Sequence, residues 1–178
     1  MQEIEVKARI KDPATLITKL ETMGCQFSDP IHQIDTIYIP IGATIPVPQG
    51  VNVLRIREQD GKYILTLKQP ITNQLDCIER ETEVINAPQM HDMIRLLGFE
   101  KSSRVEKKRK KSKYKNYEIC IDEVIDLGIF IEVETFGEDA QTLQKELFTF
   151  LETLGVKKQD QEFMGYDILL KNLRERRK

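Results

Sequence analysis

Charged side chains alternate with apolar ones along several stretches of this 178-residue chain. Near the N-terminus, Glu3, Glu5 and Lys7 occupy every second position, with Ile4 and Val6 between them. Successive side chains of a β-strand point to opposite faces, so this spacing places the charges on one face. The same alternation recurs later, with acids at Glu81, Glu83, Asp122, Glu132 and Glu134 and bases at Arg55, Arg57, Lys68, Lys107 and Arg109.

These residue types, gathered in one place, suit a polyanion together with metal ions. Mg²⁺ and Mn²⁺ prefer hard oxygen ligands and commonly bridge substrate phosphates with one or two carboxylates and water. Arginine contacts phosphate oxygens in bidentate fashion, and lysine acts as a point charge. Phosphoryl chemistry depends mainly on positioning and charge stabilisation. A nucleophilic serine, cysteine or histidine is therefore not required, and His32 and His91 are predicted to be surface residues.

The elements that must position these side chains are mostly strands. Period-two alternation predicts eight of them, over 2–10, 33–40, 51–58, 62–69, 77–85, 103–111, 116–123 and 128–136. The third and fourth strands are joined through Gln59-Asp60-Gly61, a hairpin signal because Asp-Gly tolerates positive φ. The segment Ile41–Gly50 contains Pro46 and Pro48, so it cannot continue a strand and is predicted to be a mobile loop or lid.

Four amphipathic helices fit between and after the strands. Asp12 is the predicted N-cap of the first helix, which Gly24 ends. The others are expected from Pro88 to Gly98, from about Glu138 to Gly155, and over 162–176. With apolar strand faces packed outward on these helices, the charged faces line an interior. The prediction is an α+β fold, one domain over 1–178, built on an eight-stranded antiparallel barrel that leaves no exposed edge.

The alternative is an open sheet with one face on helices and the other in water. Segregation of the charges by sign argues against it, because a solvated face mixes signs and like charges on directly opposed residues destabilise a sheet. A closed lumen filled with charge is costly unless a ligand compensates it. The interior is therefore expected to bind a polyanion with its metal ions.

Composition excludes several classes of protein. The formal net charge of −2 argues against a nucleic-acid binder, despite basic runs at Lys107–Lys113 and Arg174–Lys178. The cysteines, at Cys25, Cys77 and Cys120, are expected to be buried and reduced. No apolar signal core and no stretch of about 18 apolar residues is present, which favours a cytoplasmic protein without a membrane partner. The sequence is compatible with either a monomer or a homodimer.

The charged strands resemble a known family in order along the chain. Glu3-Ile4-Glu5-Val6-Lys7 is similar to the opening motif of the CYTH family, the triphosphate tunnel metalloenzymes. The likeness continues through Leu54-Arg55-Ile56-Arg57, Leu65-Thr66-Leu67-Lys68, Arg80-Glu81-Thr82-Glu83, Lys107-Lys108-Arg109, Ile121-Asp122-Glu123-Val124, Leu127-Gly128 and Glu132-Val133-Glu134. The segment Gln33-x-Asp35-x-x-Tyr38 and the spacing from Asp122 to Glu134 resemble the class IV adenylyl cyclase branch. Where the family often has Ser-Tyr, this chain has Gly165-Tyr166.

The resemblance implies roles for individual residues. It assigns Mg²⁺ or Mn²⁺ binding to Glu3, Glu5, Asp122, Glu132 and Glu134, with Glu81 and Glu83 as secondary candidates that can instead neutralise arginines. It assigns triphosphate binding to Lys7, Arg55, Arg57, Lys68, Lys107 and Arg109. We call the residues of this second set the cationic wall. No catalytic residue is assigned.

Three functions are compatible with these residues. The leading one is a class IV adenylyl cyclase-like enzyme that converts ATP to cyclic AMP and pyrophosphate. The second is a hydrolase of tripolyphosphate, thiamine triphosphate or a nucleoside triphosphate. The third is a non-catalytic polyphosphate or nucleotide sensor, against which the carboxylates argue, because simple anion binding favours bases alone.

Overall fold

The computed structural model describes residues 2–177, so Met1 and Lys178 lie outside the described part of the predicted domain and basic tail. The strands are β1 (Gln2–Arg9), β2 (Ile31–Pro40), β3 (Val53–Gln59), β4 (Lys62–Pro70), β5 (Asp76–Val84), β6 (Phe99–Tyr114), β7 (Tyr117–Val124), β8 (Gly128–Gly137) and β9 (Gln161–Glu162). The helices are α1 (Pro13–Thr22), α2 (Ala87–Leu96), α3 (Ala140–Thr153) and α4 (Tyr166–Arg176).

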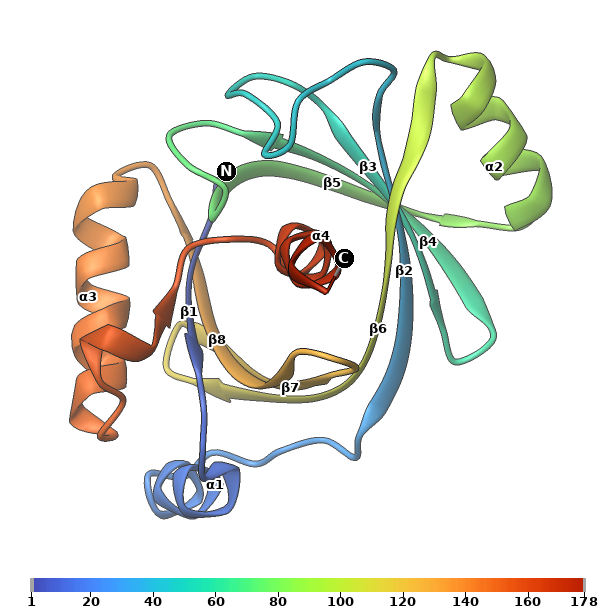
Figure 1. The fold of residues 1–178 in the computed structure, drawn as a ribbon. Coiled ribbons are helices and arrows are strands. Elements are labelled where there is room, and N and C mark those ends of the chain that lie inside the picture. The colour runs from blue at the N-terminus through green and yellow to red at the C-terminus, as the bar shows by residue number, and fades with distance from the viewer. Residues whose placement is uncertain (1, 178) are drawn as a thin grey trace.

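The strands close into a barrel (Figure 1). Their order is β5-β4-β3-β2-β6-β7-β8-β1, and β1 pairs in turn with β5 through Gln2↔Ile78, Glu3↔Cys77 and Ile4↔Asp76. All of these pairings are antiparallel. The predicted eight-stranded antiparallel barrel is therefore confirmed, and β9 adds a two-residue pairing on β1.

Local sequence explains where the elements begin and turn. Asp60 and Gly61, with φ of 51° and 73°, connect β3 and β4 at the predicted hairpin, but Gln59, expected in the turn, still belongs to β3 and pairs with Lys62. Asp12 Oδ1 accepts a hydrogen bond from the Thr15 backbone N–H at 3.1 Å and caps α1. Asn86 and Asp139 cap α2 and α3 in the same way. These caps satisfy backbone donors that a helix start leaves unpaired.

The apolar faces of the strands pack outward, as the alternation predicts. Ile4 and Val6 of β1 are buried against Leu20 of α1 and Leu147 of α3. A second cluster places Ile94 of α2 against Tyr38, Leu54 and Ile56 on the opposite side of the barrel. With three helices covering these outer faces, the polar faces of the strands are left to the interior.

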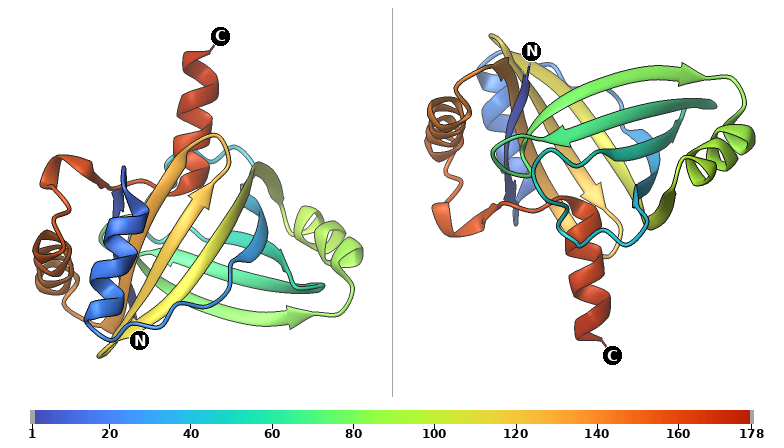
Figure 2. Two further views of the ribbon diagram at one scale, coloured as in Figure 1. Left: turned by 90° about the horizontal axis from the view of Figure 1, so that it is seen from below. Right: turned by 90° about the horizontal axis from the view of Figure 1, so that it is seen from above.

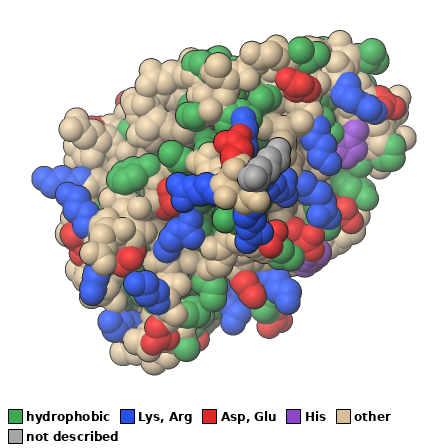
Figure 3. Space-filling model, viewed as in Figure 1, with side chains coloured by type: hydrophobic (Ala, Val, Ile, Leu, Met, Phe, Trp, Pro, Cys, Tyr) green, Lys and Arg blue, Asp and Glu red, His purple; other side chains and the backbone are tan. Residues whose placement is uncertain are grey.

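The last helix departs from the prediction that every helix packs outside. Tyr166 and Leu170 of α4 contact Ile37, Val105 and Phe130, and in the view of Figure 1 α4 is seen end-on within the outline of the ring of strands. Both views of Figure 2 show that it runs from the barrel mouth outward to the C-terminus. The helix also begins at Tyr166 rather than 162, because a 3₁₀ turn at Lys158–Asp160 and then β9 precede it. Lysine and arginine side chains gather around its outer end (Figure 3).

The cysteines are buried and unpaired as predicted. His32 is exposed, also as predicted, but His91 is not a free surface residue. Its Nδ1 lies 2.5 Å from the Tyr38 hydroxyl, and burial lowers its pKa. No helix in the described residues has the length and apolar character needed to cross a bilayer.

Candidate functional site

The first strand supplies the acids and the base that begin the site. Because Ile4 and Val6 are buried in the outer core, the alternation of β1 turns Glu3, Glu5 and Lys7 toward the interior, where all three line one cavity. β1 is also the strand that joins β8 to β5. Its charged face is therefore in contact with side chains from both halves of the chain.

Three carboxylates meet beside β1, and we call them the carboxylate triad. Glu3, Glu5 and Glu134 each offer an oxygen within 4.8 Å of the others, and Glu5 lies opposite Glu134 in the register of β1 and β8. Burial, followed by the charges of Glu3 and Glu5, raises the pKa of Glu134 to about 8. Burial raises the pKa of Glu3 to about 7 against the opposing charge of Lys68.

The triad fits a divalent cation. Its oxygens are the hard ligands that Mg²⁺ and Mn²⁺ prefer. The pKa values of Glu3 and Glu134 are raised by burial and by the neighbouring carboxylates, which oppose their ionised forms. A bound cation would supply positive charge and favour the ionised forms. Of the residues predicted to bind metal, the structure brings these together: Glu3, Glu5 and Glu134.

The other two predicted metal ligands, Asp122 and Glu132, lie in a buried ion-pair network. Asp122 accepts from Lys107 at 2.9 Å and from Arg109 Nε at 2.6 Å. Glu132 pairs with Lys7 at 3.1 Å and with Arg109. Burial alone would raise the pKa of both carboxyl groups, but the adjacent cations hold the pKa values below their usual range. The structure therefore places both residues where they position the cationic wall.

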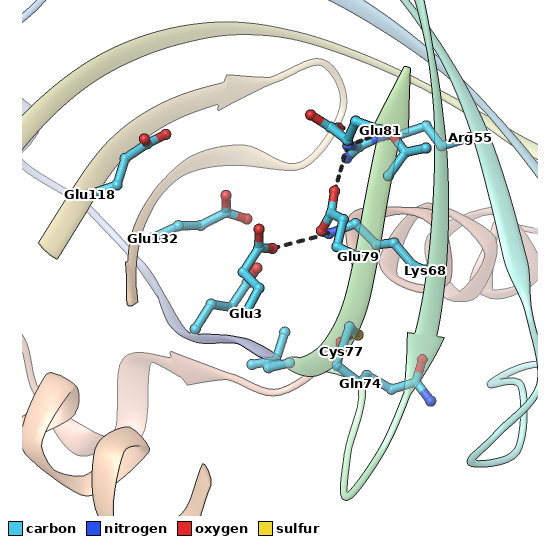
Figure 4. Close-up of polar contacts among 12 residues, drawn as sticks. Glu3, Arg55, Lys68, Gln74, Cys77, Glu79, Glu81, Glu118 and Glu132 are labelled. Atoms are coloured by element: carbon cyan, nitrogen blue, oxygen red, sulfur yellow. Dashed lines mark hydrogen bonds and ion pairs between the residues drawn. The ribbon is translucent and has the colours of Figure 1, made fainter. Parts of the chain in front are cut away.

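The rest of the cationic wall lies on β3 and β4 (Figure 4). Lys68 Nζ lies 2.6 Å from Glu79 and 3.4 Å from Glu3, so it links this region to the carboxylate triad. Arg55 contacts Glu79 at 3.1 Å and Glu81 at 3.0 Å. Glu81 thus lies beside an arginine, which was the alternative role considered for it. Glu83 points away, exposed, and pairs with Lys62.

Asp35, Glu79 and Tyr166 were not among the predicted site residues. Asp35 accepts two hydrogen bonds from Arg57, at 2.7 and 2.8 Å. The Tyr166 ring centroid lies 4.3 Å from Lys7 Nζ. Strand alternation places Glu79 on the same face as Glu81, so this signal was available in the sequence, as was Asp35 within the quoted second-strand motif. The family resemblance drew attention to Gly165-Tyr166 but gave the tyrosine no role, because its position depends on how the start of α4 packs against the barrel.

Apart from Asp122, Glu83 and its partner Lys62, these groups border one cavity of about 370 Å³, a size within the usual range for small-molecule sites. The carboxylate triad and the cationic wall both line it, and α4 contributes Tyr166 and Asp167. The cavity therefore combines a cluster of carboxylates, whose chemistry suits a divalent cation, with several fixed positive charges. An anion carrying several negative charges and chelating a metal has the complementary chemistry.

Comparisons with known proteins agree with this geometry. The CYTH domain profile matches residues 1–166. A Methanocaldococcus jannaschii protein named "Putative adenylate cyclase" is 29% identical over 156 residues, covering 86% of this chain and 88% of the relative.

Solved structures share the barrel. A Pyrococcus horikoshii protein superposes with a TM-score of 0.79 at 25% identity, covering 96% of this chain and 98% of its own. A Hippeastrum protein, described as a "putative adenylyl cyclase" with a dominant triphosphatase activity, has a TM-score of 0.58 at 16% identity, covering 92% and 90%. The closed barrel and the profile match along nearly the whole sequence show that this chain belongs to the CYTH domain family.

Proposed function

We propose that this chain is a metal-dependent enzyme that converts ATP to cyclic AMP and pyrophosphate inside its barrel. The observation that carries the proposal is that the carboxylate triad and the cationic wall face the same cavity. Substrates of the CYTH family are triphosphates, and the M. jannaschii relative carries a cyclase name. Each half of the site matches one part of a metal-bound triphosphate.

Some hydrogen-bond donors of residues that line the cavity have no partner among the described residues. Arg55 Nε and the Tyr166 hydroxyl are buried donors without a hydrogen-bond partner among residues 2–177. Burial and the nearby charge of Arg109 lower the pKa of Lys107, so its charged form is incompletely stabilised. Phosphate oxygens would accept from the free donors and stabilise the lysine. Unsatisfied buried donors are costly, so an anionic ligand is the natural complement.

Cyclisation makes one bond and breaks another. The ribose 3′-oxygen attacks the α-phosphorus, the bond from that phosphorus to the bridging oxygen breaks, and pyrophosphate leaves with the bonding electrons. The hydroxyl proton passes to water. A divalent cation at the carboxylate triad would neutralise charge on the phosphates and polarise the reacting phosphorus. Lys68 contacts Glu3 of the triad and shares Glu79 with Arg55, so both cations would stabilise the negative charge that develops on pyrophosphate.

Hydrolysis of the terminal phosphate is the second candidate. It is favoured by the chemistry of the triad and the cationic wall, which suits a metal-bound triphosphate and includes no group that would require a 3′-hydroxyl. The Hippeastrum protein has the same fold and is described as predominantly a triphosphatase, so the fold accommodates that reaction. In this case water replaces the ribose hydroxyl as nucleophile and orthophosphate is released.

Product analysis tests the proposal. The purified protein is incubated with Mg²⁺ or Mn²⁺ and, separately, with ATP, tripolyphosphate and thiamine triphosphate, and the products are separated by chromatography. We expect cyclic AMP and pyrophosphate from ATP. Orthophosphate without cyclic nucleotide would replace cyclisation with hydrolysis. Tight metal-dependent binding of all three compounds without turnover would indicate the non-catalytic sensor.

A further inference from the structure

The cavity is charged at one end and apolar at the other. Along the inner face of β2, Asp35 is followed by Ile37 and Ile39. On β3, which runs in the opposite direction, Arg57 and Arg55 are followed toward the start of the strand by Val53. Asp35 lies opposite Arg57, but Ile37 lies opposite Arg55, so β3 becomes apolar one inner-facing residue later than β2. Beyond that pair, Ile39 on β2 and Val53 on β3 are both apolar and both line the cavity. Apolar side chains from neighbouring strands therefore line one common end of the barrel.

The loop 41–50 closes this apolar end. It was predicted to be a mobile loop or lid, but hydrogen bonds attach it to the β4–β5 connection. The Gly50 N–H donates to the Pro70 carbonyl at 2.8 Å, and Gln49 donates to the Thr72 carbonyl at 2.6 Å. Ile45 and buried Val47 of this loop line the cavity. Both views of Figure 2 place the loop at the same end of the barrel as the start of α4.

Gln74 is a polar side chain in this part of the lining. Its Nε2 donates to the Val47 carbonyl at 3.0 Å, which fixes the orientation of the amide. Its Oε1 accepts no hydrogen bond from the described residues, and in Figure 4 it lies on the side of the amide nearer Lys68. A fixed and unused acceptor beside an apolar surface is suited to a flat ligand with a donor on its edge.

We infer that the apolar end binds the heteroaromatic ring of the triphosphate substrate and that Gln74 Oε1 accepts a hydrogen bond from an exocyclic amine on that ring. The inference rests on the proposed function and identifies which triphosphates fit. Adenine in ATP and the aminopyrimidine of thiamine triphosphate both carry such an amine. Guanine places a carbonyl oxygen at the corresponding position of the purine, and two acceptors facing each other leave both without a donor.

The chemistry of the apolar end also separates these ligands from tripolyphosphate. A bare polyanion gains nothing from Ile45, Val47 or Val53, whereas a ring of nucleobase size removes their apolar surface from water. ATP should therefore bind more tightly than tripolyphosphate, although both use the cationic wall. The difference between the affinities for ATP and for tripolyphosphate therefore measures what the ring site adds to binding at the phosphate site.

Calorimetry with ATP, GTP, thiamine triphosphate and tripolyphosphate tests the inference, with Ca²⁺ in place of Mg²⁺ to slow turnover. Gln74→Met removes the acceptor at similar length, and Ile45→Ala removes apolar contact without touching the amide. We expect each variant to weaken ATP binding about five- to tenfold, and tripolyphosphate binding to stay unchanged. Ile41→Ala is the matched control, because Ile41 lies in the same loop but is exposed and absent from the lining.

The outcomes separate this inference from the proposed function. If thiamine triphosphate binds more tightly than ATP, the ring site is supported and the ring that it prefers is the aminopyrimidine of thiamine. GTP binding as tightly as ATP, or equal losses of ATP and tripolyphosphate affinity in both variants, would overturn the inference and leave the phosphate site standing. A wild-type protein that binds no tripolyphosphate would instead remove the proposed function itself, and this inference with it.

Discussion

Replacing Glu134 by glutamine should stabilise the metal-free protein, and it should do so only at neutral and alkaline pH. Burial, together with the charges of Glu3 and Glu5 in the carboxylate triad, raises the pKa of Glu134 from 4.5 to about 8. The folded protein therefore holds this proton more tightly than the unfolded chain does. Its contribution to stability is fully present below pH 4.5 and is lost as the pH rises toward 8. Glutamine keeps the shape of the side chain and removes the charge that causes this loss.

The size of the effect follows from the shift. Moving a pKa from 4.5 to about 8 corresponds to on the order of 4 kcal/mol if one site carried all of it. Titration is shared with Glu3, so we expect a gain of about 1–3 kcal/mol at pH 8. For a chain of this length that is roughly 3–10 °C in melting temperature. At pH 5 the wild-type carboxyl is already protonated, and the two proteins should melt within about a degree of each other.

Thermal melts at pH 5 and pH 8, in the presence of a chelator, measure this difference. Glu58→Gln is the matched control, because Glu58 is an exposed glutamate on β3 whose loss should leave the melting temperature unchanged at both pH values. A gain for Glu134→Gln that is equal at pH 5 and pH 8 would show that packing, not charge, is responsible. A loss of stability at pH 8 would refute the repulsion within the triad.

Three further predictions concern ligands and charge. Lys68→Ala should weaken tripolyphosphate binding by roughly ten- to a hundredfold in calorimetry, whereas exposed Lys108→Ala should not; equal losses would show that the site is an outer basic patch. Mn²⁺ binding at pH 7 should release about one proton, because the triad carries shared protons that the metal displaces. Calorimetric titration in buffers of different ionisation enthalpy measures this release, and its absence would mean that the metal binds elsewhere. Burial acts to raise the pKa of Asp35, but the hydrogen bonds from Arg57 and the nearby positive charges outweigh it and leave that pKa lowered. Denaturant melts should therefore show the wild type losing stability below about pH 4 and Asp35→Asn losing less; equal acid losses would contradict this.

The barrel could be predicted because its strands repeat one physical signal. Period-two alternation identifies the inner face without knowledge of strand neighbours, which is why Glu3, Glu5, Lys68 and Arg55 were expected in the interior and are found there. The tight turn at Asp60-Gly61 was predictable for a similar reason, since it depends only on local backbone preference.

The partners of each charge depend on register, which alternation does not determine. Asp122 and Glu134 have the same signal in the sequence, yet one is held by Lys107 and Arg109 and the other lies in the triad. The closure of β1 on β5 likewise brings Glu79 toward Glu3. Such contacts between distant segments decide which carboxylates are free to bind a cation.

The position of α4 depended on tertiary packing. Its apolar residues resemble those of any amphipathic helix, and the pattern does not indicate whether they face the outside of the barrel or its mouth. In the structure Tyr166 packs against Phe130 with ring centroids 5.0 Å apart, on the inner side of the strands. That contact shapes the cavity and was not predictable from the helix alone.

Titration of Mn²⁺ into the wild-type protein and into Glu5→Gln tests the central claim most directly, which is that the carboxylate triad holds a divalent cation beside the cationic wall. The account predicts binding to wild type and to the Glu58→Gln control, and none to Glu5→Gln at the same concentrations, with far-ultraviolet circular dichroism confirming that all three proteins are folded. Unchanged Mn²⁺ affinity in Glu5→Gln would contradict it.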